Sequence, residues 1–367
     1  MLNSLFYSHL YAWYEANHRV LPWRDTQDPY AIWLSEIILQ QTRVAQGMEY
    51  YMRFLARWPR IEDLANAQEE EVLREWQGLG YYSRARNLHK AAQVIVETQK
   101  PQVESGKQNG YFFPRTFEEI RSLPGIGEYT SGAIASFAYN LPYPAMDGNV
   151  YRVLARLLDI DEPFDTTAGK KLFHREIEQL LDRNNPRLFN SAIMEFGALY
   201  CTPVLTQSSN PPCPECPIKD FCLGYAHGTA ELLPVRKPRP KVRDRWFTYH
   251  IYIQRAKEDS YPANEFYTLI QKRENPKDIW YHLYEFPCDE SPSSPSSSSS
   301  SYELTHVLSH QKIHARFILH RVADLPLIPG AISVPWSSLD DYALSRLTLR
   351  ALEHFQTLFR GEDQRGQ

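Results

Sequence analysis

The apolar residues of this 367-residue chain change their spacing near residue 245. Before that point they recur every three or four positions, as in 153–158, which is the period of an amphipathic helix. From Trp246 they alternate with polar residues, as in 247–253, which is the period of a half-buried strand. The sequence therefore predicts a mainly α N-terminal region joined to a smaller α+β domain.

The junction between these two regions, 229–245, is basic and rich in proline, which predicts an extended linker whose charges could contact phosphate. We expect the helical region to span 1–228 and the second domain to span 246–360. The polar stretch 99–113 and the serine run 291–301 predict flexible loops. In the second domain we expect further strands at 266–271, 280–286 and 315–321, and a helix at 337–358.

Composition limits the class of protein. Hydrophobic residues make up 43% of the chain, which is enough for two buried cores. No stretch approaches the roughly 20 apolar residues that cross a bilayer, and segment 1–17 lacks the basic start and apolar centre of a signal peptide. We therefore expect a soluble, cytoplasmic protein. The net charge of −4 does not by itself indicate a nucleic-acid partner, which would require a local basic face.

Four cysteines close the helical region. Cys213, Cys216 and Cys222 lie within ten residues, and Cys201 precedes them. Thiols at this spacing are cross-linked or bound to metal, and without a secretion signal a metal or iron–sulfur site is favoured. The spacing alone does not separate structural zinc from an iron–sulfur cluster. The fifth cysteine, Cys288, is expected to be an ordinary thiol.

The stretch 123–133 has the sequence LPGIGEYTSGA, in which a tight turn built on Gly125 and Gly127 leads straight into a helix. The free backbone N–H groups and the helix dipole at such a turn suit a phosphate. This is the helix–hairpin–helix pattern, which holds a DNA backbone without reading its sequence. A Gly-x-Gly by itself would indicate no more than a turn.

Glu36 shares a helix face with the apolar residues Ile32 and Leu39. A carboxyl group on an apolar stripe is costly unless it is paired or protonated, and desolvation would raise its pKa. That setting is the one a general acid needs at neutral pH. The alternative is a partly exposed glutamate at the edge of the stripe.

Asp147 stands where a helix begins, in the string Met-Asp-Gly-Asn, and is predicted to be its N-cap. That structural role is sufficient to explain it. A capping carboxylate that accepts backbone N–H bonds is also expected to stay ionised. Enzymes that break glycosidic bonds commonly use such a pair, in which one neutral carboxylic acid donates a proton and one carboxylate stays ionised.

Four blocks carry a resemblance to a known family: PWRDTQDPYAIWLSEIILQQT, GLGYYSRARNLHKAA, LPGIGEYTSGAI and MDGNVYRVLARL. They resemble the endonuclease III superfamily of base-excision DNA glycosylases, and within it the adenine DNA glycosylase (MutY) family. The resemblance is dense over about 21–224 and looser beyond. It implies a helix–hairpin–helix glycosylase region, with a six-helix barrel at about 22–140 and a [4Fe-4S] loop, followed by a Nudix-like α+β domain.

The resemblance implies a substrate and a mechanism. The substrate would be duplex DNA in which adenine is mispaired with 8-oxoguanine or guanine, bound by a monomer. Glu36 would protonate N7 of the adenine, and Asp147 would stabilise the oxocarbenium-like sugar. Tyr129 and Asn149 would position these groups. Because Tyr129 stands where strand-cleaving relatives carry a lysine nucleophile, the resemblance implies a monofunctional glycosylase.

Further positions match substrate contacts of the family. Glu195 matches an adenine-contacting glutamate, although it could equally be a buried, paired residue. Tyr81 matches a wedge that stacks beside the lesion base. Gln41, Thr42 and Leu79 match other residues that fill the space around the lesion base. Arg24 matches a further substrate-binding position.

The four cysteines Cys201, Cys213, Cys216 and Cys222 match the ligands of one [4Fe-4S] cluster. The chain departs from the family at the first spacing, because eleven residues rather than six separate Cys201 from Cys213. A longer surface loop costs little entropy. We therefore expect the cluster to be retained.

The strings FYTLIQKR and WYHLYEFP resemble the opening of a Nudix-like domain, but the Glu-rich helix that binds metal in Nudix hydrolases is missing. We expect this domain to bind rather than hydrolyse. Leu308, Ser309 and His310 match the family loop that reads 8-oxoguanine, where Phe-Ser-His is common. The alternative is an ordinary hairpin loop.

Two other functions stay open at this point. The first is a bifunctional glycosylase of the endonuclease III type that acts on pyrimidine lesions, against which Tyr129 and the C-terminal domain weigh. The second is a non-catalytic iron–sulfur protein that binds DNA, against which Glu36 and Asp147 weigh.

Overall fold

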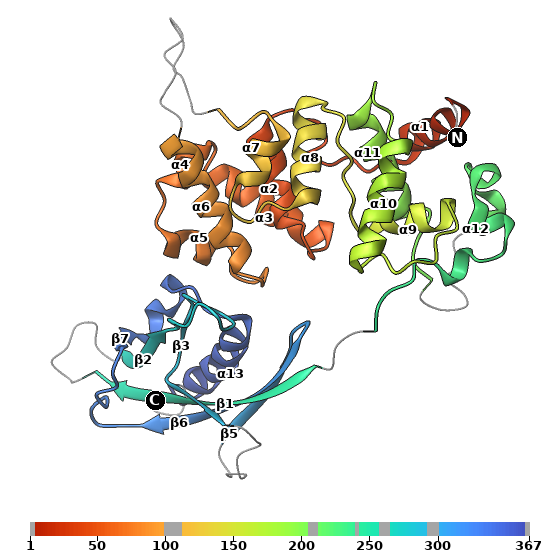
Figure 1. The fold of residues 1–367 in the computed structure, drawn as a ribbon. Coiled ribbons are helices and arrows are strands. Elements are labelled where there is room, and N and C mark those ends of the chain that lie inside the picture. Colours follow the sequence, from red (N-terminus) through yellow and green to blue (C-terminus); the bar gives the residue numbers. More distant parts are fainter. Residues whose placement is uncertain are drawn as a thin grey trace, which may run out of the picture. The chain divides into compact units, whose positions relative to one another are not determined.

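The computed structural model describes residues 4–98, 112–204, 212–238, 242–256, 265–291 and 301–363 (Figure 1). By their contacts these residues form two compact units. The first comprises 1–65 and 90–238, and the second comprises 66–89 and 239–367. Segment 66–89 thus groups with the C-terminal residues, and the boundaries expected at 228 and 246 remain a prediction.

Unit 1 is helical. Its helices are α1 (Ser4–Asn17), α2 (Pro29–Ile38), α3 (Val44–Arg57), α4 (Ile61–Ala65), α7 (Phe117–Ser122), α8 (Glu128–Tyr139), α9 (Gly148–Leu157), α10 (Thr167–Leu180), α11 (Pro186–Leu199) and α12 (Leu223–Ala226). Short 3₁₀ turns lie at Cys213–Glu215, Lys219–Phe221 and Ala230–Leu232. Helix α6 (Ser83–Thr98) crosses from unit 2 into unit 1.

Helix α2 lies at the centre of unit 1. It begins with Pro29 in the first turn, and Asp28 caps it by accepting the Tyr30 backbone N–H at 3.0 Å. From Tyr30 to its last residue every side chain is buried, and the helix packs against α3 and α8. A helix that is covered all round in this way holds its polar residues at fixed positions.

Helices α9 and α11 approach each other closely at Gly197. A Cβ atom at Gly197 would lie 2.7 Å from the Cβ of Asn149 and 2.9 Å from its backbone oxygen. Only glycine therefore allows this contact. It brings the N-terminus of α9 against α11.

Unit 2 contains α5 (Glu69–Glu75), the start of α6, and a sheet in the order β3-β2-β1-β6-β5. In addition, β4 pairs with β1 and β7 pairs with β2. The strands are β1 (Arg243–Arg255), β2 (Phe266–Lys272), β3 (Tyr284–Glu285), β4 (Cys288–Ser291), β5 (Ser301–Val307), β6 (Gln311–Arg321) and β7 (Ala331–Pro335). Strands β1 and β6 run parallel.

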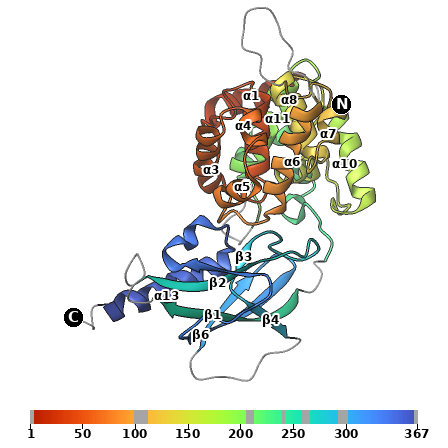
Figure 2. The ribbon, with the colours of Figure 1, turned by 90° about the vertical axis from the view of Figure 1, so that its left-hand side faces the viewer.

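One face of this sheet forms the core of the unit with helix α13 (Arg346–Asp363) (Figure 2). Phe247, Tyr249 and Ile251 of β1 meet Leu347 and Leu352 of α13 there. The alternation of buried and partly exposed residues along β1 is the period-two pattern that the sequence shows. The prediction of a mainly α region followed by an α+β domain is confirmed.

Three local predictions need correction. The expected strand at 280–286 is reduced to Tyr284–Glu285, because Trp280 and His282 adopt left-handed backbone conformations, with φ of 59° and 65°. The helix expected at 337–358 starts only at Arg346 and is preceded by a 3₁₀ turn, Trp336–Asp341. The strand expected from Trp246 starts earlier, because β1 begins at Arg243.

The loops expected at 99–113 and 291–301 fall almost wholly on residues outside the described ranges. Within the described parts of the chain, no helix combines the length and apolar character that crossing a membrane requires.

Candidate active site

A cavity of about 320 Å³ opens among the helices of unit 1. It gathers residues from α2, α8, α9 and α11 together with the segment before α2. Of the residues predicted from the sequence, the following line it: Arg24, Glu36, Gln41, Thr42, Tyr129, Asp147, Asn149 and Glu195.

Glu36 lies in the third turn of α2 and is only 5% exposed. The hydroxyl of Tyr129, from the first turn of α8, donates to Glu36 Oε2 at 2.5 Å. Burial raises the pKa of Glu36, and the nearby charge of Asp147 acts in the same direction. The charge of Arg24 and the hydrogen bond from Tyr129 oppose this rise without reversing it. The exposed-edge alternative for Glu36 is therefore excluded.

Tyr129 keeps its proton in this site. Burial, followed by the charges of Glu36 and Asp147, raises its pKa well above the usual value of 10.0. Its hydroxyl thus remains a donor to Glu36 at any physiological pH.

Asp147 caps α9 as predicted. Its Oδ1 accepts the backbone N–H groups of Asn149 at 2.9 Å and Val150 at 2.8 Å. Its Oδ2 accepts the Asn149 side-chain amide at 2.7 Å. The expectation that these bonds keep Asp147 ionised remains a prediction, because burial and the cap bonds act on its pKa in opposite directions. Burial raises the pKa of Asp147 above 3.8, although the cap bonds and the charge of Arg152 pull it down.

The two carboxyl groups differ in how many hydrogen bonds support an anion. Asp147 accepts three and Glu36 accepts one from Tyr129. Hydrogen bonds to a carboxylate favour its ionised form. Of the two, Glu36 is therefore the better proton carrier and Asp147 the better anion.

Arg152 of α9 is a site residue that the sequence did not reveal. Its guanidinium donates to Asn149 Oδ1 at 2.8 Å, to the Gly197 carbonyl at 2.5 Å and to the Cys201 carbonyl at 2.7 Å. It thus fixes the amide that holds Asp147. An arginine in a helix usually indicates an exposed face, so the sequence carries no signal for this burial.

Arg19 is a second residue that sequence reasoning missed. Its backbone N–H and its Nε donate to Glu195 Oε1 at 3.0 and 2.6 Å, and one NH2 donates to Oε2 at 2.8 Å. Burial acts to raise the pKa of Glu195, but these bonds and the charges of Arg19 and Arg24 lower it overall. Glu195 is therefore a buried, paired carboxylate that also lines the cavity.

Most of the residues expected beside the lesion base lie in a second cavity, which belongs to unit 2 and has a volume of about 380 Å³. The structure brings the following together there: Leu79, Tyr81, Leu308, Ser309 and His310. Tyr81 is 44% exposed, with φ of 47°. Gln41 and Thr42 do not line this cavity; they line the one that holds Glu36.

The hairpin glycines connect α7 to α8. Gly125 has φ of 76°, a conformation that favours glycine, and Gly127 is the N-cap of α8. A Cβ atom at Gly127 would meet nothing within 4 Å, so the backbone there faces open space. An approaching phosphate would meet free N–H groups at this turn.

The four predicted cysteine ligands line one small cavity of about 30 Å³, together with Arg156. None of the five cysteines, all of which the structure describes, is in a disulfide. Burial raises the pKa of the Cys213 and Cys222 thiols, and raises that of Cys216 to about 12. Among the residues described, no three His, Cys, Asp or Glu side chains are arranged to hold a single metal ion. The lengthened loop between Cys201 and Cys213 lies mostly outside the described residues.

Comparisons with known proteins agree with this geometry. Residues 34–181 match the family described as HhH-GPD superfamily base excision DNA repair protein. The chain is 34% identical over 288 residues to the adenine DNA glycosylase of Buchnera aphidicola subsp. Baizongia pistaciae (strain Bp), which covers 78% of this chain and 74% of that protein. It is 39% identical over 251 residues to the adenine DNA glycosylase of Mus musculus, which covers 66% of this chain and 46% of that protein.

Among solved structures, a thermostable thymine-DNA glycosylase is 26% identical with a TM-score of 0.51, over 61% of this chain and 96% of that one. The chain thus spans less than half of the mouse relative and about three quarters of the Buchnera relative. The extent of the Buchnera match, together with the shared fold, assigns the chain to a family. The chain belongs to the adenine DNA glycosylases of the helix–hairpin–helix base-excision repair superfamily.

Proposed function

We propose that this chain excises adenine mispaired with 8-oxoguanine, or with guanine, from duplex DNA by hydrolysing the N-glycosidic bond. The observation that carries the proposal is the placement of buried Glu36 and helix-capping Asp147 on the wall of one cavity. An acid that holds its proton beside a better-supported carboxylate is the pairing that glycosidic cleavage needs.

The reaction proceeds on an adenine that has been turned out of the duplex into this cavity. Glu36 gives its proton to N7, which makes the neutral purine a leaving group. The bond between C1′ and N9 then breaks with its electron pair going to the base. Asp147 stabilises the cationic sugar that is left. Water then attacks C1′ and gives a proton to the Glu36 carboxylate, which restores the acid.

Tyr129 sets both the position and the chemistry of Glu36. Its hydroxyl holds Glu36 Oε2, which leaves the other carboxyl oxygen for the purine. A phenol cannot form the Schiff base with the opened sugar that strand cleavage requires. We therefore infer a monofunctional enzyme, and Tyr129 weighs against the bifunctional alternative.

We propose that Cys201, Cys213, Cys216 and Cys222 hold one [4Fe-4S] cluster. The fit rests on the donor set: four thiols line one cavity, although among the described residues no three side chains are arranged for a single ion. Four thiols can hold one tetrahedral zinc or one iron–sulfur cluster, and the resemblance to the glycosylase family favours the cluster. When bound, the cluster would fix the loop after α11, and Arg156 would donate to Cys201 Sγ, which it does at 3.2 Å here.

We propose that the cavity of unit 2 receives the base that pairs with the adenine. Tyr81 and Leu308 offer apolar surface there, and Ser309 and His310 offer hydrogen-bonding groups. Duplex DNA is the partner, held without sequence preference by the hairpin of Gly125 and Gly127. The chain is proposed to act as a monomer.

The test is adenine release from a duplex that carries one 8-oxoguanine:adenine pair. Release that leaves an alkali-labile site supports the proposal. Strand cleavage without alkali, at oxidised pyrimidines rather than at the mispair, would indicate the bifunctional alternative. Binding without release of any base would indicate a non-catalytic DNA-binding protein.

A further inference from the structure

The turn that replaces the expected strand at 280–286 holds its backbone in an unusual conformation. Trp280 and His282 both have positive φ, although neither is glycine. Such residues persist only where surrounding contacts over-determine them, and they concentrate at functional positions. The contacts that hold this turn are therefore informative.

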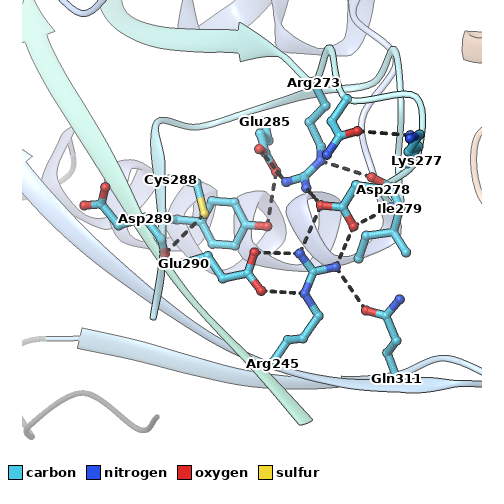
Figure 3. A network of polar contacts seen from close by, with 12 residues as sticks. Arg245, Arg273, Lys277, Asp278, Ile279, Glu285, Cys288, Asp289, Glu290 and Gln311 are labelled. Atoms are coloured by element: carbon cyan, nitrogen blue, oxygen red, sulfur yellow. Dashed lines mark hydrogen bonds and ion pairs between the residues drawn. The ribbon is translucent and has the colours of Figure 1, made fainter. Parts of the chain in front are cut away.

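A network of charged side chains holds the residues just before this turn (Figure 3). Arg273 donates to the Ile279 carbonyl at 3.1 Å and to Asp278 Oδ2 at 2.6 Å. Arg245 donates to both oxygens of Asp278, at 2.5 and 3.0 Å, and also pairs with Glu290. We call Arg245, Asp278 and Arg273 the clamp. Arg245, expected in a phosphate-binding linker, is instead 7% exposed inside unit 2.

The clamp reaches a second loop. Arg245 NH1 donates to Gln311 Oε1 at 3.1 Å. The backbone oxygen of Gln311 accepts the N–H of Leu308 at 2.8 Å, which closes the turn that carries Ser309 and His310. One buried guanidinium thus ties together the loop before Trp280 and the loop proposed to read the lesion.

Both loops line the same cavity of unit 2. Trp280 is partly buried in its wall, and its ring meets that of His306 edge-on, with centroids 5.9 Å apart. Tyr81 and Leu308 line the same space. Leu308 is apolar but has no aromatic face. The aromatic surface that the residues after 245 offer to this cavity comes from Trp280 and from the imidazole rings of His306 and His310.

We propose that Trp280 stacks on the base that pairs with the adenine, and that the clamp positions it for this contact. The inference rests on the proposed function of this cavity. Base–aromatic stacking tolerates any base, because every base has a π-face. Trp280 would supply the aromatic surface that Leu308 lacks, whereas Ser309 and His310 would distinguish 8-oxoguanine from guanine.

The test is a cycle of four dissociation constants measured with the full chain. The DNA carries 2′-fluoro-adenosine, which resists cleavage, opposite either 8-oxoguanine or an abasic site. The proteins are wild type and Trp280→Leu, which keeps a non-glycine residue at the same strained φ. Stacking predicts that Trp280→Leu weakens binding to the 8-oxoguanine duplex roughly tenfold or more, and leaves binding to the abasic duplex nearly unchanged. Equal losses on both duplexes would overturn the proposal, because a purely structural role does not depend on the base.

Three further variants sharpen the result. Trp280→Phe keeps an aromatic face and should restore most of the base-dependent affinity. Gln311→Leu removes the contact between the clamp and the second loop, while Arg245 keeps Asp278 and Glu290. It should reduce the base-dependent part of the binding affinity. Trp246→Leu is the matched control, because Trp246 does not line this cavity and stacks on His314, with ring centroids 5.1 Å apart. It should leave the base-dependent part of the binding affinity unchanged.

The failure of this inference can be distinguished from the failure of the proposed function. If the wild type does not release adenine from the 8-oxoguanine mispair, the proposed function fails. If the wild type releases adenine and loses affinity on the abasic duplex, but Trp280→Leu shows no dependence on the base, only the role of Trp280 fails.

Discussion

The hydroxyl of Tyr129 donates to Glu36 Oε2 at 2.5 Å, and so joins the first turn of α8 to the buried centre of α2. A single contact thereby fixes the rotamer of the proposed acid and lowers its pKa against the effect of burial. Both groups line the cavity that also holds Asp147.

Tyr129→Phe removes this hydrogen bond without changing the shape of the ring. We expect single-turnover adenine release to slow by about tenfold to a hundredfold, since a hydrogen bond to an ionisable group is worth roughly 1.5–3 kcal/mol. The bond lowers the pKa of Glu36, so its loss should raise that pKa further. Because the acid must be protonated to act, the rate of adenine release by the variant should begin to fall at a higher pH than the rate of the wild type. A pH–rate profile checks this, and a fall that moves to lower pH would contradict it.

At neutral pH Glu36 should lower the free energy of unfolding. Burial raises the pKa of Glu36 in the folded protein above its usual value of 4.5. The folded protein is therefore most stable with respect to Glu36 below pH 4.5, where the side chain is protonated in both states. That stability is lost as the pH rises through the folded pKa, because the buried group must then ionise. We expect Glu36→Gln to raise the melting temperature at pH 8 and to change it much less at pH 5, with roughly 2–4 °C for each kcal/mol. Thermal melts at the two pH values test this, with exposed Glu128→Gln as the control.

Arg19→Gln should destabilise the fold by leaving Glu195 buried without its charged partner. Breaking a fully buried pair costs about 3–5 kcal/mol. The Arg19 side chain is 37% exposed, so we expect roughly 1–3 kcal/mol after allowing for solvent screening. The folded pKa of Glu195 is lowered, so this pair stabilises above about pH 4.5 and loses its effect as the pH falls through the folded pKa. Urea unfolding of Arg19→Gln and of Arg19→Gln/Glu195→Gln should show that the second change recovers part of the loss. A double variant less stable than the single one would argue against the pairing.

Cys201→Ser tests whether the cysteine before the long loop is a cluster ligand. We expect the purified variant to lose most of its bound iron and visible absorption, because a [4Fe-4S] cluster is held by four thiolates. Cys288→Ser is the control, since Cys288 lies in strand β4 of unit 2 and should leave both signals unchanged. Equal iron content in the two variants would remove Cys201 from the ligand set.

Local rules were sufficient to predict much of this site. The Asp147 cap and the hairpin of Gly125 and Gly127 follow from neighbours within a turn or two of helix. Helical spacing placed Glu36 on an apolar face but left a partly exposed position open, and its burial depends on packing against other helices. The pairing of Arg19 was not predicted, because its partner Glu195 lies 176 positions away in the sequence. The alternating residues 280–286 resemble a strand, yet Arg245 and Arg273 hold the preceding loop through Asp278. Those contacts depend on tertiary structure, which no local pattern reveals.

The central claim is that Glu36 delivers the proton that releases adenine. The most direct measurement is single-turnover adenine release from an 8-oxoguanine:adenine duplex by Glu36→Gln, with Glu128→Gln as the matched control on α8. The account predicts that Glu36→Gln binds the duplex as tightly as the wild type and releases adenine roughly 10²–10⁴-fold more slowly, the range that a general acid contributes. Near-normal release by Glu36→Gln would contradict the account.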